Sequence, residues 1–95
     1  MTIERIAEGS ALTLVLAGRL DTTTAPRLDA ALAALDGVQT LTLDFSALDY
    51  LSSAGLRVLL SAHKRMKGRM TVRSVNETIR EVFEVTGFLD VLHIE

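Results

Sequence analysis

The chain has no cysteine and no tryptophan, a single proline, and an aromatic content of only 4%. Without cysteine, neither disulfides nor thiolate metal sites stabilise it, which fits a reducing compartment and leads us to expect a cytoplasmic protein. Hydrophobic residues still make up 48% of the sequence, so the core must be built from Leu, Val, Ile and Ala. At 95 residues, we expect one domain, residues 1–95, near the lower size limit for folding without cross-links.

Excess positive charge and long apolar runs are missing as well. The formal net charge is -2, which argues against nucleic-acid binding, because such proteins normally present a basic patch. No apolar run approaches the roughly 18 residues of a membrane span. No basic segment followed by an apolar run marks a signal peptide at the start of the chain. We therefore expect neither membrane insertion nor export.

Short apolar runs alternate with helical patterns, which predicts the order β-β-α-β-α-β-α-β. Only Gly9 and Ser10 separate the first two strands, so these should pair as an antiparallel hairpin. The later strands alternate with helices, which requires right-handed crossovers and a mostly parallel sheet. The expected fold is α/β, a four- to five-stranded sheet with three to four helices. Strands are expected at 2–8, 11–18, 40–45, 70–75 and 91–94, and helices at 24–37, 53–67 and 77–86.

Local signals mark where these elements should begin and end. Thr24 can cap the first helix, and Gly37 can close it. Ser74 and Glu77 are spaced as a capping box for the last helix, with Gly87 as its stop. The run A-L-T-L-V-L-A-G, residues 11–18, is nearly all apolar, which is typical of a strand buried on both faces.

Two loops are expected at the carboxyl ends of strands, at 19–24 and 46–53, where ligands and partners of such sheets usually bind. The second loop carries D-Y-L-S-S-A-G-L-R. A serine nucleophile there needs a base within hydrogen-bond reach. The nearer histidine, His63, is about 15 Å further along the helix at ~1.5 Å per residue. Phosphate-binding glycine motifs are absent too, so we expect no enzyme and no cofactor.

Two acidic residues, Asp21 and Asp44, are expected at strand ends. Such a pair can hold a divalent cation. The alternative interpretation is that both are solvated carboxylates that accept hydrogen bonds from nearby backbone N–H groups. Nothing else of metal-binding type lies near them in the sequence, so we favour this second interpretation and expect no metal site.

The adjacent serines, Ser52 and Ser53, have two interpretations. A serine at a helix start accepts hydrogen bonds from backbone N–H groups that have no partner within the helix. The same place suits a phosphoryl group, because N–H donors and the positive helix end are available and Gly55 leaves room. Phosphorylation would add about -1.5 to -2 charges, which Asp21 and Asp44 would repel if their loops share one edge. Composition and spacing leave both interpretations open.

Three segments resemble the STAS domains of bacterial anti-sigma-factor antagonists. The main one is L-D-F-S-A-L-D-Y-L-S-S-A-G-L-R-V-L-L, which resembles the family's strand, serine motif and helix. G-R-L-D-T-T-T-A-P-R-L is similar to the loop before its first helix. V-N-E-T-I-R-E-V-F-E-V-T-G-F-L-D-V-L is similar to its last helix and closing strand. Three such segments in order cover nearly the whole chain.

The resemblance implies a partner switch. In this family the unmodified antagonist binds a serine-kinase anti-sigma factor and so frees the sigma factor. The kinase, using its own ATP, phosphorylates a serine of the antagonist and ends the complex. A metal-dependent serine phosphatase reverses the modification. ATP would therefore reach this chain only through its kinase partner.

Aligned on Gly55, the family's acceptor falls on Ser53. Many members have Asp where this chain has Ser52, so Ser52 remains an alternative acceptor, and we expect it to cap the helix while Ser53 presents its hydroxyl. Tyr50 and Leu51 are expected to pack into the core beneath the loop. Arg57 is either a solvated charge or a contact to an acidic partner. The partner-binding residues that the resemblance implies are Asp21, Thr22, Thr23, Asp44, Ser52, Gly55, Leu56 and Arg57.

Two other functions compete with the sigma-factor pathway. The first is a STAS subunit of another assembly, such as a stressosome-like scaffold or a lipid-transport ATPase. The second is an independent enzyme or nucleotide-binding domain, which the missing phosphate loop and base disfavour.

Overall fold

The expected hairpin opens the fold of the computed structural model, which describes Met1–Glu95. β1 (Thr2–Glu8) pairs antiparallel with β2 (Ala11–Leu20). All other strand pairs are parallel, in the sheet order β1-β2-β3-β4-β5. The predicted element order is confirmed. The remaining elements are α1 (Ala25–Leu32), β3 (Thr40–Leu51), α2 (Ser53–Met66), β4 (Met70–Arg73), α3 (Glu77–Thr86), the 3-10 turn η1 (Phe88–Asp90) and β5 (His93–Ile94).

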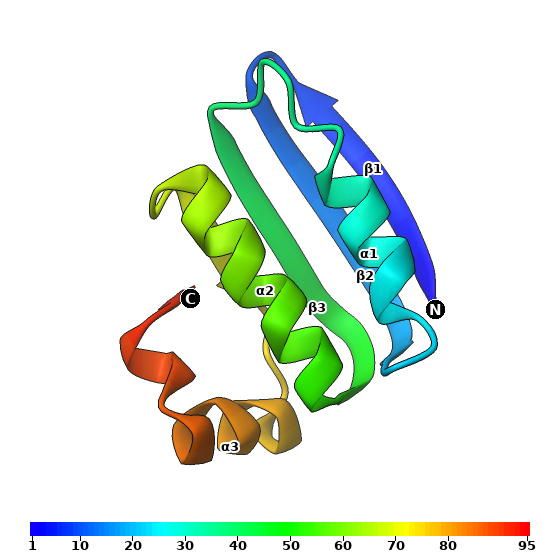
Figure 1. Cartoon of the computed structure of the whole chain (residues 1–95), viewed down its shortest axis with the longest axis vertical. Helices are drawn as coiled ribbons and strands as arrows, with labels where there is room; N and C mark the ends of the chain where they lie inside the picture. Colours follow the sequence, from blue (N-terminus) through cyan, green and yellow to red (C-terminus); the bar gives the residue numbers. More distant parts are fainter.

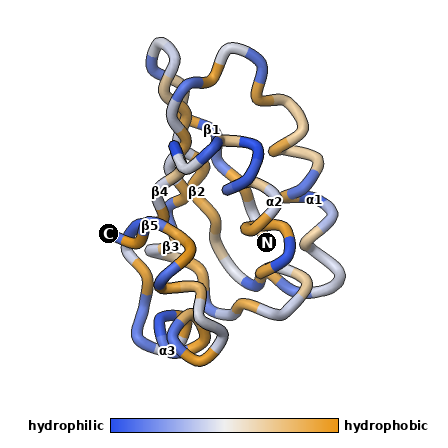
Figure 2. Tube along the Cα trace, turned by 60° about the vertical axis from the view of Figure 1, so that its left-hand side comes forward, coloured by the Kyte–Doolittle hydropathy of each residue, from blue (hydrophilic) through white to orange (hydrophobic).

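The helices cover one face of the sheet. α1 and α2 lie side by side across β2 and β3, and α3 lies beyond the start of α2 (Figure 1). Turned by 60°, the strands and the two helices separate into two layers (Figure 2). The core between them is aliphatic apart from Phe45 and Phe83, and it contains no buried polar side chain. None of the helices combines the length and apolarity needed to cross a membrane.

Because no helix covers the second face, β2 is not buried on both sides as its composition predicts. Leu12, Leu14 and Leu16 are buried against the helices. Thr13 and Val15, which alternate with them, are only half-buried. That prediction is therefore wrong. The face of β2 that packs against the helices requires apolar residues, and the uncovered face accepts them without requiring them.

β3 continues six residues past its expected end at Phe45, so the predicted loop at 46–53 is mostly strand. Up to Phe45 every second residue is buried, whereas Leu48 and Leu51 follow at intervals of three. The pairing of β2 with β3 is irregular at two places along this stretch. An extra residue in one strand forms a bulge that resets which side chains point inward. The two bulges explain the change in spacing.

Helix ends differ from the predictions at several points. α1 ends at Leu32 rather than near Gly37, and Thr24 makes no side-chain capping bond. α3 is capped by Asn76, whose side chain accepts from the Ile79 N–H at 2.8 Å, so the predicted capping box is not formed. The stop at Gly87 is confirmed, with φ of 81° in the left-handed region. β4 ends at residue 73, short of the predicted 75.

Candidate functional site

The two serines occupy different positions at the start of α2. Ser52 is the N-cap, with φ of -97° and ψ of 173°, and its Oγ accepts from the Gly55 N–H at 3.3 Å. The Ser52 N–H donates to the Leu20 carbonyl at 2.9 Å, which ties the helix start to the end of β2. Ser53 is the first helical residue and is exposed. The expected cap is therefore confirmed, and the hydroxyl of Ser53 faces solvent.

Gly55 holds this first turn tightly against the sheet. A Cβ atom built at Gly55 would lie 2.7 Å from Leu51 Cδ1 and 2.8 Å from Leu20 Cγ, distances that real Cβ atoms do not adopt. Leu56 is also buried, with 7% of its surface exposed. The expectation that Gly55 leaves room for a phosphoryl group is wrong, because the space that it leaves is filled by the core. Gly55 and Leu56 therefore support the exposed residues of the turn from below.

Asp21 organises the loop between β2 and α1, beside the serines. Its Oδ1 accepts from the N–H groups of Thr23 and Thr24, each at 3.0 Å. The Thr24 hydroxyl donates to the Arg19 carbonyl at 2.7 Å and accepts from the Asp21 N–H at 2.9 Å. The Thr24 backbone bond is the strongest of the interactions that lower the pKa of the Asp21 carboxyl. Thr24 thus closes the loop instead of capping α1.

The same end of the molecule carries a cation–π pair, Arg19 on Tyr50, which sequence reasoning missed. The Arg19 guanidinium lies 4.1 Å from the centroid of the Tyr50 ring, and its Nε is 3.7 Å from Asp21 Oδ2. Tyr50 is 41% exposed, so its expected burial beneath the loop is wrong, whereas Leu51 is buried as predicted. The bulges in β3 turn Tyr50 outward. Only the spacing of Leu48 and Leu51 in the sequence signals that rotation.

Asp44 lies away from this end. It is opposite Val15 and Arg73 within the sheet, whereas Asp21 follows the last residue of β2. At ~3.3 Å per strand residue, about 15–20 Å separates the two carboxylates along the sheet. They therefore do not share an edge, contrary to the expectation that Asp44 ends its strand.

The Asp44 carboxylate is held by bonds to neighbouring residues. Its Oδ2 lies 3.1 Å from the Arg73 guanidinium, and its Oδ1 accepts from the Ser46 N–H at 2.8 Å. Partial burial acts to raise the pKa of Asp44, but the bonds from Ser46 and Arg73 outweigh burial and lower it. Asp44 therefore stabilises the sheet where β4 ends.

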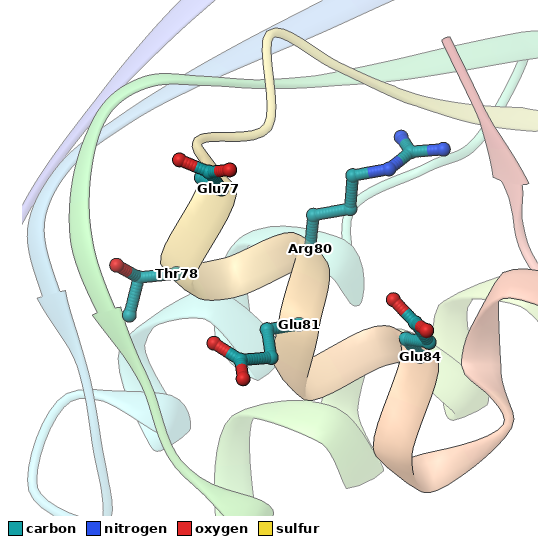
Figure 3. A pocket seen from close by; sticks show the side chains of 5 residues that line it. All are labelled: Glu77, Thr78, Arg80, Glu81 and Glu84. Atoms are coloured by element: carbon teal, nitrogen blue, oxygen red, sulfur yellow. The ribbon is translucent and has the colours of Figure 1, made fainter.

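The serine turn is not part of any surface hollow. Four hollows are present, and neither serine lines one of them. The largest, about 460 Å³, lies on α3, and its lining side chains project from that helix (Figure 3); they are Glu77, Thr78, Arg80, Glu81 and Glu84. Ser53, Thr22, Thr23 and Arg57 are all exposed, and the bond from the Ser52 N–H to the Leu20 carbonyl ties the start of α2 to the strand end from which the loop with Thr22 and Thr23 leaves. Such a surface suits contact with another protein.

Comparison with known families gives this site a context. The model of the family described as "Mlab, STAS domain" matches residues 4–93. The chain therefore belongs to the STAS domain family, as the resemblance of its motifs predicts.

Relatives within this family have regulatory names. A Bordetella bronchiseptica protein named as an anti-sigma factor antagonist, BtrV, is 38% identical over 84 residues, which cover 83% of this chain and 72% of that protein. The anti-sigma-B factor antagonist of Listeria monocytogenes is 28% identical over 88 residues, covering 86% of this chain and 76% of that protein.

Solved structures confirm the fold. An anti-sigma factor antagonist from Mycobacterium paratuberculosis superimposes with a TM-score of 0.88 at 24% identity, covering 98% of this chain and 83% of the other. The antagonist SpoIIAA in its unphosphorylated form gives 0.77 at 18% identity, covering 99% and 87%. The Bacillus SpoIIAA structure in the phosphorylated form gives 0.76 at 19% identity, covering 99% and 91%.

Proposed function

We propose that this chain is an anti-sigma factor antagonist controlled by phosphorylation of Ser53. The unphosphorylated form binds a serine-kinase anti-sigma factor and so releases the sigma factor, and phosphorylation ends that binding. A serine phosphatase restores the active form. The names of the Bordetella and Listeria relatives support the antagonist role. The existence of SpoIIAA structures in unphosphorylated and phosphorylated forms supports the switch.

The observation that carries this proposal is the division of labour between the two serines. Ser52 is engaged through its Oγ with Gly55 and through its N–H with Leu20. A kinase would therefore have to modify an oxygen that already caps α2. Ser53 is exposed and its hydroxyl makes no hydrogen bond within the chain, so it accepts a phosphoryl group without disturbing the fold.

The chain supplies only the hydroxyl in this reaction. The bond between the γ-phosphorus of ATP and its bridging oxygen breaks, and a bond from that phosphorus to Ser53 Oγ forms. The hydroxyl proton passes to a base of the kinase, and ADP leaves. In this proposal the chain is a substrate and a regulator, and the kinase partner provides ATP and catalysis.

Electrostatics explains how the switch ends binding without refolding. A phosphoryl group adds about -1.5 to -2 charges to an exposed position. Asp21, in the adjoining loop, has its pKa lowered and so is already ionised at neutral pH. A partner surface that accommodates Thr22, Thr23 and Asp21 together with a neutral Ser53 would meet a much more negative surface after modification. We leave Asp44 outside this interface, because it lies within the sheet and pairs with Arg73.

The test begins by recovering the partner with the tagged chain from its source cells. The recovered kinase is then incubated with ATP and the wild type, Ser53→Ala or Ser52→Ala, and the modified residue is mapped by mass spectrometry. We expect Ser53→Ala to abolish modification and Ser52→Ala, the matched control, to retain it. Modification that persists in Ser53→Ala contradicts the assignment. Recovery of a scaffold or a transport ATPase, with no kinase, would instead support a STAS subunit of another assembly.

A further inference from the structure

Ser53 and Arg57 lie on one face of α2. They are four residues apart in the helix, and both are exposed. An α-helix has ~3.6 residues per turn, so residues four apart are neighbours, with Cβ atoms about 5–6 Å apart. Of the residues between them, Gly55 and Leu56 are buried and Ala54 is small. None of the three residues between Ser53 and Arg57 is fully exposed, so no charged or long exposed side chain of α2 stands between them.

The Arg57 side chain also makes no ion pair or hydrogen bond within the chain. The two ion pairs of the chain join Arg19 with Asp21 and Arg73 with Asp44. Further guanidinium groups donate to backbone carbonyls, namely those of Arg27, Arg65 and Arg69. Arg57 takes part in none of these interactions, and the first turn of α2 contains no acidic residue. Its guanidinium is therefore free to take an anionic partner.

We propose that Arg57 is the built-in counter-ion of phosphorylated Ser53. Once the phosphoryl group is on Ser53 Oγ, the guanidinium binds its oxygens and holds the modified side chain along α2. An acid placed four residues before a base is the favourable orientation on a helix, and the planar fork of arginine matches phosphate oxygens. This inference rests on the proposed function, because it takes Ser53 as the modified residue.

The pairing gives the modification two effects on the surface. The local charge of the Ser53–Arg57 pair changes from +1 to about -1 when a dianionic phosphate is added. In addition, the cation that the unmodified chain offers to a partner becomes occupied. A partner that binds Arg57 through a carboxylate thus loses that contact at the same moment as it meets the new negative charge.

The test uses the full chain with phosphoserine incorporated at position 53 during translation, so that no kinase is needed. The second ionisation of the phosphate is followed by ³¹P NMR against pH at low salt. We expect Arg57→Gln to raise the midpoint by about 0.3 of a pH unit, the size of an i,i+4 pair. The matched control, Lys64→Gln, removes the same charge from the far end of α2, and it should move the midpoint clearly less than Arg57→Gln does, because ~16 Å separates it from position 53.

Two further readouts define the pair. Arg57→Lys keeps the charge but lacks the fork, so it should retain part of the shift, and 0.5 M NaCl should reduce the difference between wild type and Arg57→Gln. Equal midpoints for wild type and Arg57→Gln overturn the inference, as do equal shifts in Arg57→Gln and Lys64→Gln. A kinase that modifies another residue refutes the proposed function but leaves this titration unchanged. Equal midpoints refute the pair and leave the kinase assignment standing.

Discussion

The two ends of α2 differ in whether charged side chains complement the helix dipole. The last turn contains Lys64 and Arg65, whose positive charge suits the negative helix end, whereas the first turn contains no acidic residue. α3 provides a reference, because Glu77 occupies its first turn. Charges that complement a helix end contribute about 0.3–1 kcal/mol at exposed sites. The sequence thus compensates one end of α2 permanently and leaves the other open to a charge that can be added and removed.

Packing differs between these ends as well. The first turn lies against Leu20 and Leu51 through Gly55, with no space for a Cβ atom. At the other end, Lys67 and Gly68 are exposed and have positive φ values of 52° and 82°. A Cβ atom built at Gly68 would meet nothing within 4 Å. The end that presents the candidate acceptor is therefore the rigidly packed one, which keeps Ser53 in a fixed place.

The largest expected effect comes from breaking that packing. Gly55→Val should lower the free energy of unfolding by about 2–3 kcal/mol, because its side chain overpacks the contact with Leu20 and Leu51. Gly68→Ala, at the open end, should cost only about 1 kcal/mol, which is the strain of the left-handed backbone. Urea unfolding of both variants measures the difference. Equal losses would show that the first turn is no more tightly packed than the last.

A second, smaller effect separates the two serines. Ser52→Ala removes the capping oxygen and should lower the free energy of unfolding by about 1 kcal/mol. Ser53→Ala should stay within about 0.5 kcal/mol, because Ser53 is exposed and makes no bond. Thermal and urea unfolding at pH 7 measure both. A greater loss in Ser53→Ala than in Ser52→Ala would contradict the assignment of the cap.

The smallest effect concerns acid. The folded pKa of Asp21 is lowered, chiefly by the Thr24 backbone bond, so its contribution to stability is complete above the unfolded pKa. That contribution is lost as the pH falls through the folded pKa, which lies below the model-peptide value of 3.8. NMR should show the Thr24 N–H titrating in this range. The Gly68 N–H, which donates to the His63 carbonyl at 3.3 Å, should not follow it. Matching titrations would contradict the local role of Asp21.

Periodicity and turn residues were enough to predict the order of the elements, because each helix and strand carries its own pattern. They were not enough to find the end of β3. Two bulges change the inward spacing from two to three, and a strand with that spacing resembles a loop. The error moved Asp44 to a strand end and placed Tyr50 in the core.

Most hydrogen bonds between side chains and the backbone could not be predicted from the sequence either. Thr24 and Asn76 are both residue types that cap helices, but only the Asn76 side chain makes a capping bond. The Thr24 hydroxyl instead bonds to the Arg19 carbonyl and the Asp21 N–H. The cap at Ser52 could be predicted because the helix pattern begins directly after it. The stacking of Arg19 on Tyr50 could not, because it depends on how two strands are aligned.

That stacking has a practical consequence. Tyr50 is the single tyrosine of a chain without tryptophan, so it is the source of the intrinsic ultraviolet emission above the phenylalanine range. The residue is 41% exposed, and its ring lies beneath the Arg19 guanidinium at the end of the molecule that carries Ser52 and Ser53. The chain therefore carries an unlabelled optical reporter beside its candidate binding surface, and its fluorescence reports on events at that end and not at the basic end of α2.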